Sequence, residues 1–203
     1  MQPQAVVFDL GNVLIRWDPH PAIAAEVGPE EATRFLTDPD FDFATWNLAQ
    51  DAGRTWTEAE GVAQRTHPHF ARHALAYRRN FDRSLLGPIE DSVRILEELD
   101  AAGVRLFAVT NWSHELFPHA RARFGFLERF EDIVVSGTEG VAKPEPGIFD
   151  VLARRSRLPL PACVFVDDKP ENVAAAASAG MDGIVFSDTG HLRRDLRERG
   201  LPV

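Results

Sequence analysis

The sequence predicts an α/β fold in which a parallel sheet carries helices on both faces and an all-helical segment follows the first strand. Short apolar runs rich in β-branched residues recur along the chain, and from the second run onward they alternate with helical patterns. Residues 16–86 contain no strand-like run and look helical throughout. The 203 residues, of which 44% are hydrophobic and 26% charged, can form a substantial core.

The strand-like runs cover residues 5–9, 104–110, 133–136, 163–167 and 183–186. Apolar spacing predicts helices between them. "IEDSVRILEELDAAG" ends at Gly103, "PENVAAAASAG" repeats its form before Gly180, and the first of them places on one face Ile89, Val93, Leu96 and Leu99. Strand, helix and strand at these lengths predict right-handed crossovers and therefore a parallel sheet with two helical layers.

Residues 16–86 are predicted to form a helical cap on a core made of residues 1–15 and 87–203. "PEEATRFL" opens with a proline in the first turn of a helix, and "TEAE", from Thr57 to Glu60, fits a capping box. The return stretch "LLGPIED" has the glycine and proline expected at a hinge. An insertion here stands over the strand ends and is placed to close on a ligand as a lid. A helical subdomain that only adds core is the alternative.

Composition argues against several classes of partner. The net charge of −9 and the pI near 5.2 argue against nucleic acid and anionic membranes, which need a basic surface. Cys163 is the only cysteine, which excludes an intrachain disulfide, and its apolar surroundings predict a core residue. The N-terminus has no secretion-signal pattern, and no apolar run approaches the length of a membrane span. We therefore expect a soluble cytoplasmic protein with no evident obligate protein partner.

Three carboxylates lie where predicted strands end. Asp9 ends the first strand in "VVFDLGNVLI", and Asp167 and Asp168 end the fourth in "VFVDDKPENV". The carboxyl ends of parallel strands share one edge, where open sheets bind ligands. Carboxylates gathered there repel one another unless a cation intervenes, and Mg²⁺ binds carboxylates, water and substrate oxygens. The alternatives are Asp9 as a turn residue and Asp168 as a helix cap with Glu171, although capping leaves Asp167 unexplained.

Polar groups also follow the second and third strands. In "AVTNWS" the hydroxyl, amide and backbone N–H groups of Thr110 and Asn111 could hold an oxyanion, although such a pair is also common in turns. In "GVAKPEPG" Lys143 lies in the loop after the third strand, from which it could reach the same edge and offset an anionic ligand. The alternative for Lys143 is an ordinary solvated charge.

These four stretches, in this order, resemble the motifs of the haloacid dehalogenase-like hydrolase superfamily. The closest likeness is to the bacterial group whose first motif is D-L-G-N-V, which includes sugar-phosphate phosphatases and many proteins named loosely as dehalogenases. The likeness extends to "WNLAQDAGR" in the insertion and "TNWSHELFP" after the second strand. It implies a hydrolase with a Rossmann-like core and a helical cap.

The resemblance also implies roles for particular residues. Asp9 would be the nucleophile and would form an aspartyl-phosphate that water then hydrolyses. Mg²⁺ would be held by the Asp9 carboxylate, the Gly11 backbone carbonyl and Asp168, with Asp167 acting through water or by supporting these ligands. The phosphoryl group would be bound by Thr110, Asn111 and Lys143.

Gly11 is where this sequence departs from the family pattern. Phosphatases of the superfamily usually have a second aspartate there, which protonates the leaving group and then activates water. General acid catalysis is typically worth about 10²- to 10⁴-fold in rate, so its loss is serious. Asp18, His20 and His114 are possible substitutes. If none of them acts, rates should depend steeply on the acidity of the leaving group.

The leading hypothesis is a Mg²⁺-dependent phosphatase of a small phosphorylated metabolite, for example a sugar phosphate. The first alternative is a metal-independent 2-haloacid dehalogenase, which also lacks the second aspartate but leaves Asp167 and Asp168 uncompensated. The second alternative is a noncatalytic binding or regulatory protein. Substrate choice would depend on the insertion residues that fill the closed pocket, for which the candidates are Trp17, Trp46, Gln50 and Arg54.

Overall fold

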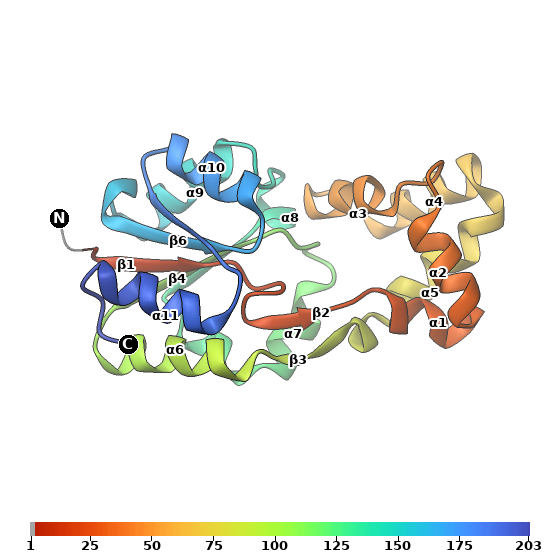
Figure 1. Cartoon of the computed structure of the whole chain (residues 1–203). Helices are drawn as coiled ribbons and strands as arrows, with labels where there is room; N and C mark the ends of the chain where they lie inside the picture. The colour runs from red at the N-terminus through yellow and green to blue at the C-terminus, as the bar shows by residue number, and fades with distance from the viewer. Residues whose placement is uncertain (1–2) are drawn as a thin grey trace.

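A five-stranded parallel sheet forms the centre of the molecule (Figure 1). The computed structural model describes residues 3–203, and the strand order is β5-β4-β1-β6-β7. The strands are β1 (Ala5–Phe8), β4 (Arg105–Thr110), β5 (Asp132–Val135), β6 (Cys163–Asp167) and β7 (Asp182–Val185). All neighbouring pairs are parallel. The predicted strands are therefore confirmed, with no end displaced by more than one residue.

Helices cover both faces of this sheet. The helices α9 (Gly147–Ser156) and α10 (Pro170–Ser178) lie on one face, and α6 (Glu90–Ala101) and α11 (Thr189–Glu198) lie on the other (Figure 1). Side chains of each strand alternate between the two layers, so that Val7 packs on the α9 side and Phe8 on the α6 side. Because both layers are apolar, the strands appear as unbroken apolar runs, and the predicted fold class is confirmed.

Five helices form an insertion between two short strands that follow β1. They are α1 (His20–Val27), α2 (Pro29–Thr37), α3 (Phe43–Asp51), α4 (Trp56–Thr66) and α5 (Ala71–Arg79). Phe35 is central to their packing, with its ring centroid 4.6 Å from that of Phe41 and 5.2 Å from that of Phe70. Such tilted and edge-to-face contacts are favourable beyond the area they bury. The helical insertion therefore has an aromatic core of its own.

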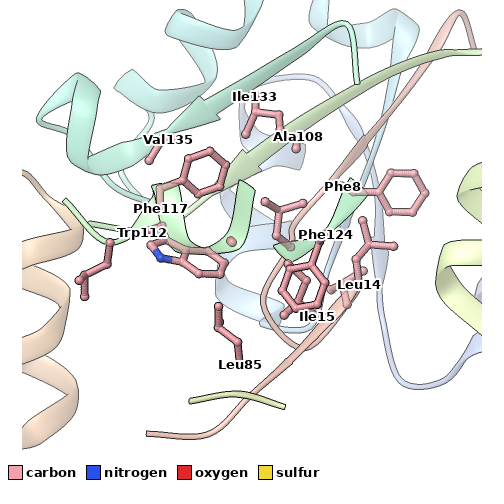
Figure 2. Packing of buried hydrophobic residues seen from close by; sticks show 14 of the residues in the cluster. Phe8, Leu14, Ile15, Leu85, Ala108, Trp112, Phe117, Phe124, Ile133 and Val135 are labelled. Atoms are coloured by element: carbon pink, nitrogen blue, oxygen red, sulfur yellow. The ribbon is translucent and has the colours of Figure 1, made fainter. Parts of the chain in front are cut away.

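The strands on either side of the insertion were not expected from the sequence. β2 (Ile15–Trp17) and β3 (Leu85–Pro88) pair antiparallel in a ribbon that joins the insertion to the sheet (Figure 1). Figure 2 shows Ile15 and Leu85 in the same buried cluster as Phe124. The expectation that residues 16–86 are helical throughout is wrong here, because strands this short, one of them ending in Gly87 and Pro88, give no periodic signal. The division at 15/16 and 86/87 stays a prediction, and both positions fall within this ribbon.

The predicted capping box lies two residues too late. The N-cap of α4 is Thr55, whose hydroxyl accepts from the N–H of Glu58 at 3.2 Å, while the Glu58 carboxylate accepts from the N–H of Thr55 at 3.0 Å. Trp56, the first residue of the helix, is buried, and its packing fixes where the helix begins. The predicted end of α6 is correct, since Gly103 follows it with a φ of +75°.

Short elements complete the chain. They are α7 (Phe117–Arg123), α8 (Ser136–Glu139) and the 3₁₀ turns Pro68–Phe70, Phe81–Ser84, Gly125–Arg129 and Leu160–Ala162. Cys163 is buried in the core, as predicted, and burial raises the pKa of its thiol to about 11. Within residues 3–203, every helix is too short or too polar to span a membrane.

Candidate active site

The polar residues at the strand ends meet at one edge of the sheet. Asp9 follows β1, and Thr110 and Asp167 end β4 and β6, the two neighbours of β1. The N–H of Asp9 donates to the carbonyl of Val166 at 2.8 Å, so the sheet still holds the chain at this position. All three polar side chains are buried, and this edge faces the helical insertion (Figure 1).

Lys143 is fully buried between two of these carboxylates. Its Nζ lies 3.0 Å from Oδ1 of Asp9 and 2.7 Å from Oδ2 of Asp167, and it also donates to the carbonyl of Val109 at 2.8 Å. Burial disfavours the charged form of Lys143, but Asp9 and Asp167 outweigh this effect and raise its pKa. The structure therefore places a permanent cation beside Asp9 and excludes the alternative of a solvated lysine.

Asp167 holds neighbouring groups of this sheet edge in place and does not face the cavity. Its two oxygens accept hydrogen bonds from the N–H of Lys169 at 2.8 Å, from the amide of Asn172 at 3.0 Å and from Lys143 at 2.7 Å. With 0% of its surface exposed, Asp167 does not line the cavity described below. Its carboxylate is thus occupied with holding Lys143 in place.

Asp168 is the carboxylate that remains for a cation. Asp9, Asp167 and Asp168 each offer one oxygen, and these oxygens lie within 4.8 Å of one another. Burial raises the pKa of Asp9 to about 6, against the opposing effect of Lys143, and burial together with Asp167 raises the pKa of Asp168. The capping alternative has no support, because α10 has no side-chain hydrogen bond at its N-cap, Lys169. This partly buried set of hard oxygen donors fits Mg²⁺.

Asn111 is engaged with the loop that carries Lys143. Its side-chain amide donates to the carbonyl of Lys143 and its side-chain oxygen accepts from the N–H of Lys143, both at 2.8 Å. These two bonds fix the Lys143 backbone beside β4. The part of Asn111 in substrate binding stays a prediction, and its side chain is already used for positioning.

A cavity of about 610 Å³ lies between this edge and the helical insertion. Its floor includes Asp9, Gly11, Thr110, Lys143 and Asp168. The other walls are largely apolar, and their large side chains are those of Trp17, Leu36, Phe43, Leu48, Trp56, Tyr77, Phe81, Trp112 and Leu116. The cavity is therefore charged at the sheet edge and aromatic toward the insertion.

The predicted substitutes for a second aspartate differ in position. Asp18 lines the cavity, and its Oδ1 accepts from the N–H of His20 at 2.8 Å. The ring of His20 instead contacts the carbonyl of Pro29 and the hydroxyl of Thr33, both at 3.1 Å, and is not part of the cavity wall. His114 is exposed and also lies outside the cavity wall.

Of the four insertion residues expected in the pocket, Trp17 alone lines the cavity. Gln50 and Arg54 both donate to the carbonyl of Trp46, at 2.7 and 2.8 Å, and Arg54 also donates to Gln50 at 2.6 Å. These three residues therefore form a hydrogen-bonded support within the insertion. The expectation that they fill the pocket is wrong.

The face of α3 that lines the cavity was missed at the sequence level. Ala44, Asn47, Leu48 and Asp51 all line it, at the spacing of one helix face, whereas Gln50 is buried within the insertion. This spacing is the sequence signal that could have identified the cavity-lining face of α3. Its use requires the correct bounds of α3 and knowledge of which face meets the core.

The helical insertion is seated on the loops after β4 and β5. The indole N–H of Trp56 donates to the hydroxyl of Ser113 at 3.0 Å, and the backbone N–H of Trp56 donates to Glu115 at 2.7 Å. A Cβ at Gly53 would lie 3.4 Å from the Cα of Gly140, so the backbones approach closely beside α8. The structure therefore has the insertion in contact with the core above the cavity.

Comparisons with known proteins agree with this architecture. The haloacid dehalogenase-like hydrolase family model matches residues 3–180. The sesquiterpene phosphatase astK of Aspergillus oryzae is 24% identical over 206 residues, which cover 96% of this chain and 95% of that protein. The fructose-1-phosphate phosphatase YqaB of Escherichia coli is 28% identical over 142 residues, which cover 68% of this chain and 74% of that protein.

Solved structures show the same fold. The HAD family enzyme bt-2542 from Bacteroides thetaiotaomicron, in a magnesium complex, matches with a TM-score of 0.73 and 19% identity, covering 96% of this chain and 100% of that one. This likeness is one of fold and extends over almost the whole chain. Because the family model spans most of the sequence, the chain belongs to the haloacid dehalogenase-like hydrolase family.

Proposed function

We propose that this hydrolase is a Mg²⁺-dependent phosphatase that cleaves a small phosphorylated metabolite through an aspartyl-phosphate on Asp9. The observation that carries the proposal is the position of Asp9 in the cavity floor, with Lys143 Nζ 3.0 Å away and Asp168 beside it. A nucleophile, a fixed cation and a site for a divalent cation are the parts that phosphoryl transfer needs. The phosphatase relatives support the same choice.

Asp9, Asp168 and the backbone carbonyl of Gly11 would hold the cation, and Asp167 would act by supporting the site. Once bound, Mg²⁺ would offset the repulsion between Asp9 and Asp168 and neutralise charge on the phosphoryl oxygens. Asp168 lines the cavity beside Asp9, and this second carboxylate favours the phosphatase over a metal-independent dehalogenase. Dehalogenation also uses a nucleophilic aspartate but has no need of a second carboxylate.

The residues of this chain would act in two steps. Among residues 3–203, the hydrogen bonds to the Asp9 carboxylate come from Leu10 and Lys143 and both reach Oδ1, so Oδ2 is the oxygen placed to attack phosphorus. Lys143 and the Thr110 hydroxyl would bind the phosphoryl oxygens as charge builds on them. Water would then hydrolyse the aspartyl-phosphate and release inorganic phosphate.

The side chains in the cavity walls indicate which kind of leaving group the site would accept. Lys143 and Asp168 define a polar end for the phosphate, while the walls toward the insertion carry Trp17, Phe43 and Tyr77. Aromatic walls favour a leaving group with an apolar or ring-shaped surface. We infer that the insertion opens to admit this group and closes to exclude water, as a lid does.

The test is a phosphatase screen with Mg²⁺ or with excess chelator, against aryl, sugar and prenyl phosphates. We expect Mg²⁺-dependent release of inorganic phosphate that Asp9→Asn abolishes, because an amide keeps the shape of the carboxylate but is a far poorer nucleophile. Full activity in excess chelator, or halide release from a 2-haloacid in its place, would refute the phosphatase and favour the dehalogenase. Binding of phosphate esters without turnover would favour a noncatalytic protein.

A further inference from the structure

Asp51 is a carboxyl group of the insertion that reaches the candidate active site. It is the last residue of α3 and lines the same cavity as Asp9, from the opposite body of the protein. The side-chain amide of Asn47 donates to its Oδ2 at 3.1 Å, and the nearby backbone N–H of Ser113 acts to lower its pKa. Because Ser113 lies in the loop after β4, the end of α3 lies close to the sheet edge.

The surroundings of Asp51 favour a protonated carboxyl. Burial is the main effect and raises its pKa to about 7, with a further contribution from Asp9, while the Ser113 N–H, Lys169 and Lys143 oppose the rise. Tyr77, on α5, is a further titratable group nearby, and its pKa is raised by burial and by the charge of Asp51. A carboxyl that exchanges its proton near neutral pH is well matched to acid–base catalysis there.

The direction of the reaction places an acid on this side of the cavity. In phosphoryl transfer the attacking and leaving oxygens are roughly in line, so attack from Asp9 directs the leaving oxygen away from the sheet and toward the insertion. Gly11 offers no side chain, and no atom lies within 4 Å of the Cβ position there, so that part of the site is open space. Asp18 also lines the cavity, but its Oδ1 already accepts from the N–H of His20.

We propose that Asp51 is the general acid and base of this enzyme and supplies from the insertion what Gly11 cannot supply from the core. This inference rests on the proposed phosphatase function. In the first step the bond from Asp9 Oδ2 to phosphorus forms, the bond from phosphorus to the leaving oxygen breaks, and the Asp51 proton moves to that oxygen. In the second step Asp51 takes a proton from the attacking water, the bond from the water oxygen to phosphorus forms and the bond from phosphorus to Asp9 Oδ2 breaks. Inorganic phosphate then leaves, with Asp9 ionised and Asp51 protonated again.

The assignment couples chemistry to closure. The proton donor belongs to the insertion and the nucleophile to the core, so both line one cavity only when the insertion contacts the core, as it does here through Trp56 and Ser113. An open enzyme would then have a nucleophile without an acid. This arrangement would limit turnover to the closed, water-excluding state.

The experiment measures kcat/KM for aryl phosphates of graded phenol pKa, with the wild-type protein in saturating Mg²⁺ and with Asp51→Asn. We expect a shallow dependence on leaving-group pKa in the wild type and a steep one in Asp51→Asn. The variant should lose about 10²- to 10⁴-fold with phenyl phosphate and far less with p-nitrophenyl phosphate, whose leaving group needs little protonation. For phenyl phosphate, the wild-type rate should fall above about pH 7, and the variant should lose this limb of the profile.

Two further variants separate the alternatives. His114→Gln, at an exposed position outside the cavity, should keep the wild-type slope. Asp18→Asn should also keep a shallow slope, and a steep slope in Asp18→Asn with a shallow one in Asp51→Asn would transfer the role to Asp18 and overturn the proposal. Circular dichroism checks that each variant is folded, and Asp51→Ala replaces Asp51→Asn if the latter is not.

The outcomes distinguish this inference from the function on which it rests. A wild type without Mg²⁺-dependent turnover of any aryl phosphate would overturn the phosphatase and the acid together. A steep wild-type slope that Asp51→Asn leaves unchanged would overturn only the role of Asp51, because the phosphatase would then work without an acid. A shallow slope made steep by Asp51→Asn alone supports both.

Discussion

Lys143 and Asp9 form a buried ion pair, with Nζ of the lysine 3.0 Å from Oδ1 of the aspartate. The same Nζ lies 2.7 Å from Oδ2 of Asp167, so one cation is shared by two buried carboxylates. Buried charges are tolerated only with partners, and removing one partner leaves the others uncompensated. The group that would bind the phosphoryl oxygens is therefore also part of what keeps this edge of the sheet folded.

The first prediction concerns the loss of this cation. We expect Lys143→Met to abolish turnover and to lower the free energy of unfolding by about 3–5 kcal/mol, the usual cost of breaking a buried pair from one side. Lys169→Met is the matched control, because Lys169 lines the same cavity but is exposed, and its loss should change the free energy of unfolding by less than about 0.5 kcal/mol. Urea unfolding measures both, and equal stability of the two variants would contradict the prediction.

The second prediction concerns the cation site. Asp168→Ala should weaken Mg²⁺ binding by at least about tenfold, since the loss of even a group that only supports a metal ligand typically costs about 10- to 100-fold. Asp167→Asn should weaken it less, because Asp167 is occupied with Lys143, Asn172 and the Lys169 backbone. Calorimetric titration with Mg²⁺ compares the two variants. A larger loss in Asp167→Asn would make Asp167 the principal ligand.

The third prediction is a pH dependence of stability that arises from Asp51. Its folded-state pKa of about 7 lies above the ordinary value of 3.8, so folding favours the protonated form. The stability contribution of this group is present below about pH 4 and is lost as the pH rises toward 7, beyond which it stays constant. Asp51→Asn removes this loss, so its stability relative to the wild type should grow between pH 4 and 8. Parallel urea midpoints over that interval would show that Asp51 titrates normally.

The fourth prediction concerns the contact between Trp56 and Ser113. Trp56→Phe keeps a ring at this position but removes the hydrogen bond to the Ser113 hydroxyl, a loss of about 1 kcal/mol. Hydrogen exchange should then become faster in the loop at residues 113–116 and at the end of α3. Trp46→Phe is the control, because the indole of Trp46 donates to the carbonyl of Ala59 within the insertion. Equal exchange in the 113–116 loop of both variants would show that the Trp56 bond does not hold the insertion down.

The sheet could be predicted because its strands are buried on both faces. Val6, Val7 and Phe8 form an unbroken apolar run, which is typical of a strand buried on both faces. The carboxyl group of Asp9, which follows them, lies at the same edge as Asp167 because the two strands are parallel. The β2–β3 ribbon could not be predicted, since its strands are too short to show a period. The capping box was predicted two residues too late because the burial of Trp56, which is a tertiary effect, decides where α4 begins.

Asp51 escaped the sequence analysis for a different reason. Nothing in "WNLAQDAGR" distinguishes Asp51 from a solvated helix-end carboxylate, because the groups of the sheet edge that act on it, Ser113 and Lys143 among them, lie far away in the chain. Gln50 and Arg54 were more conspicuous as polar residues in an apolar setting, yet they bond to the Trp46 carbonyl. A local pattern identifies a helix face, but the partner of that face is set by the fold.

The β2–β3 ribbon constrains how the insertion can move. Both covalent links between the two bodies run through it, side by side, while α3 meets α8 on the opposite side of the molecule (Figure 1). A body tethered along one side has a single easy rotation, about the axis of the tether. That rotation would part Trp56 from Ser113 and lift Asp51 from Asp9 in one movement, without breaking a strand pair. Opening of the insertion would then admit the substrate and move the proton donor away from the nucleophile at the same time.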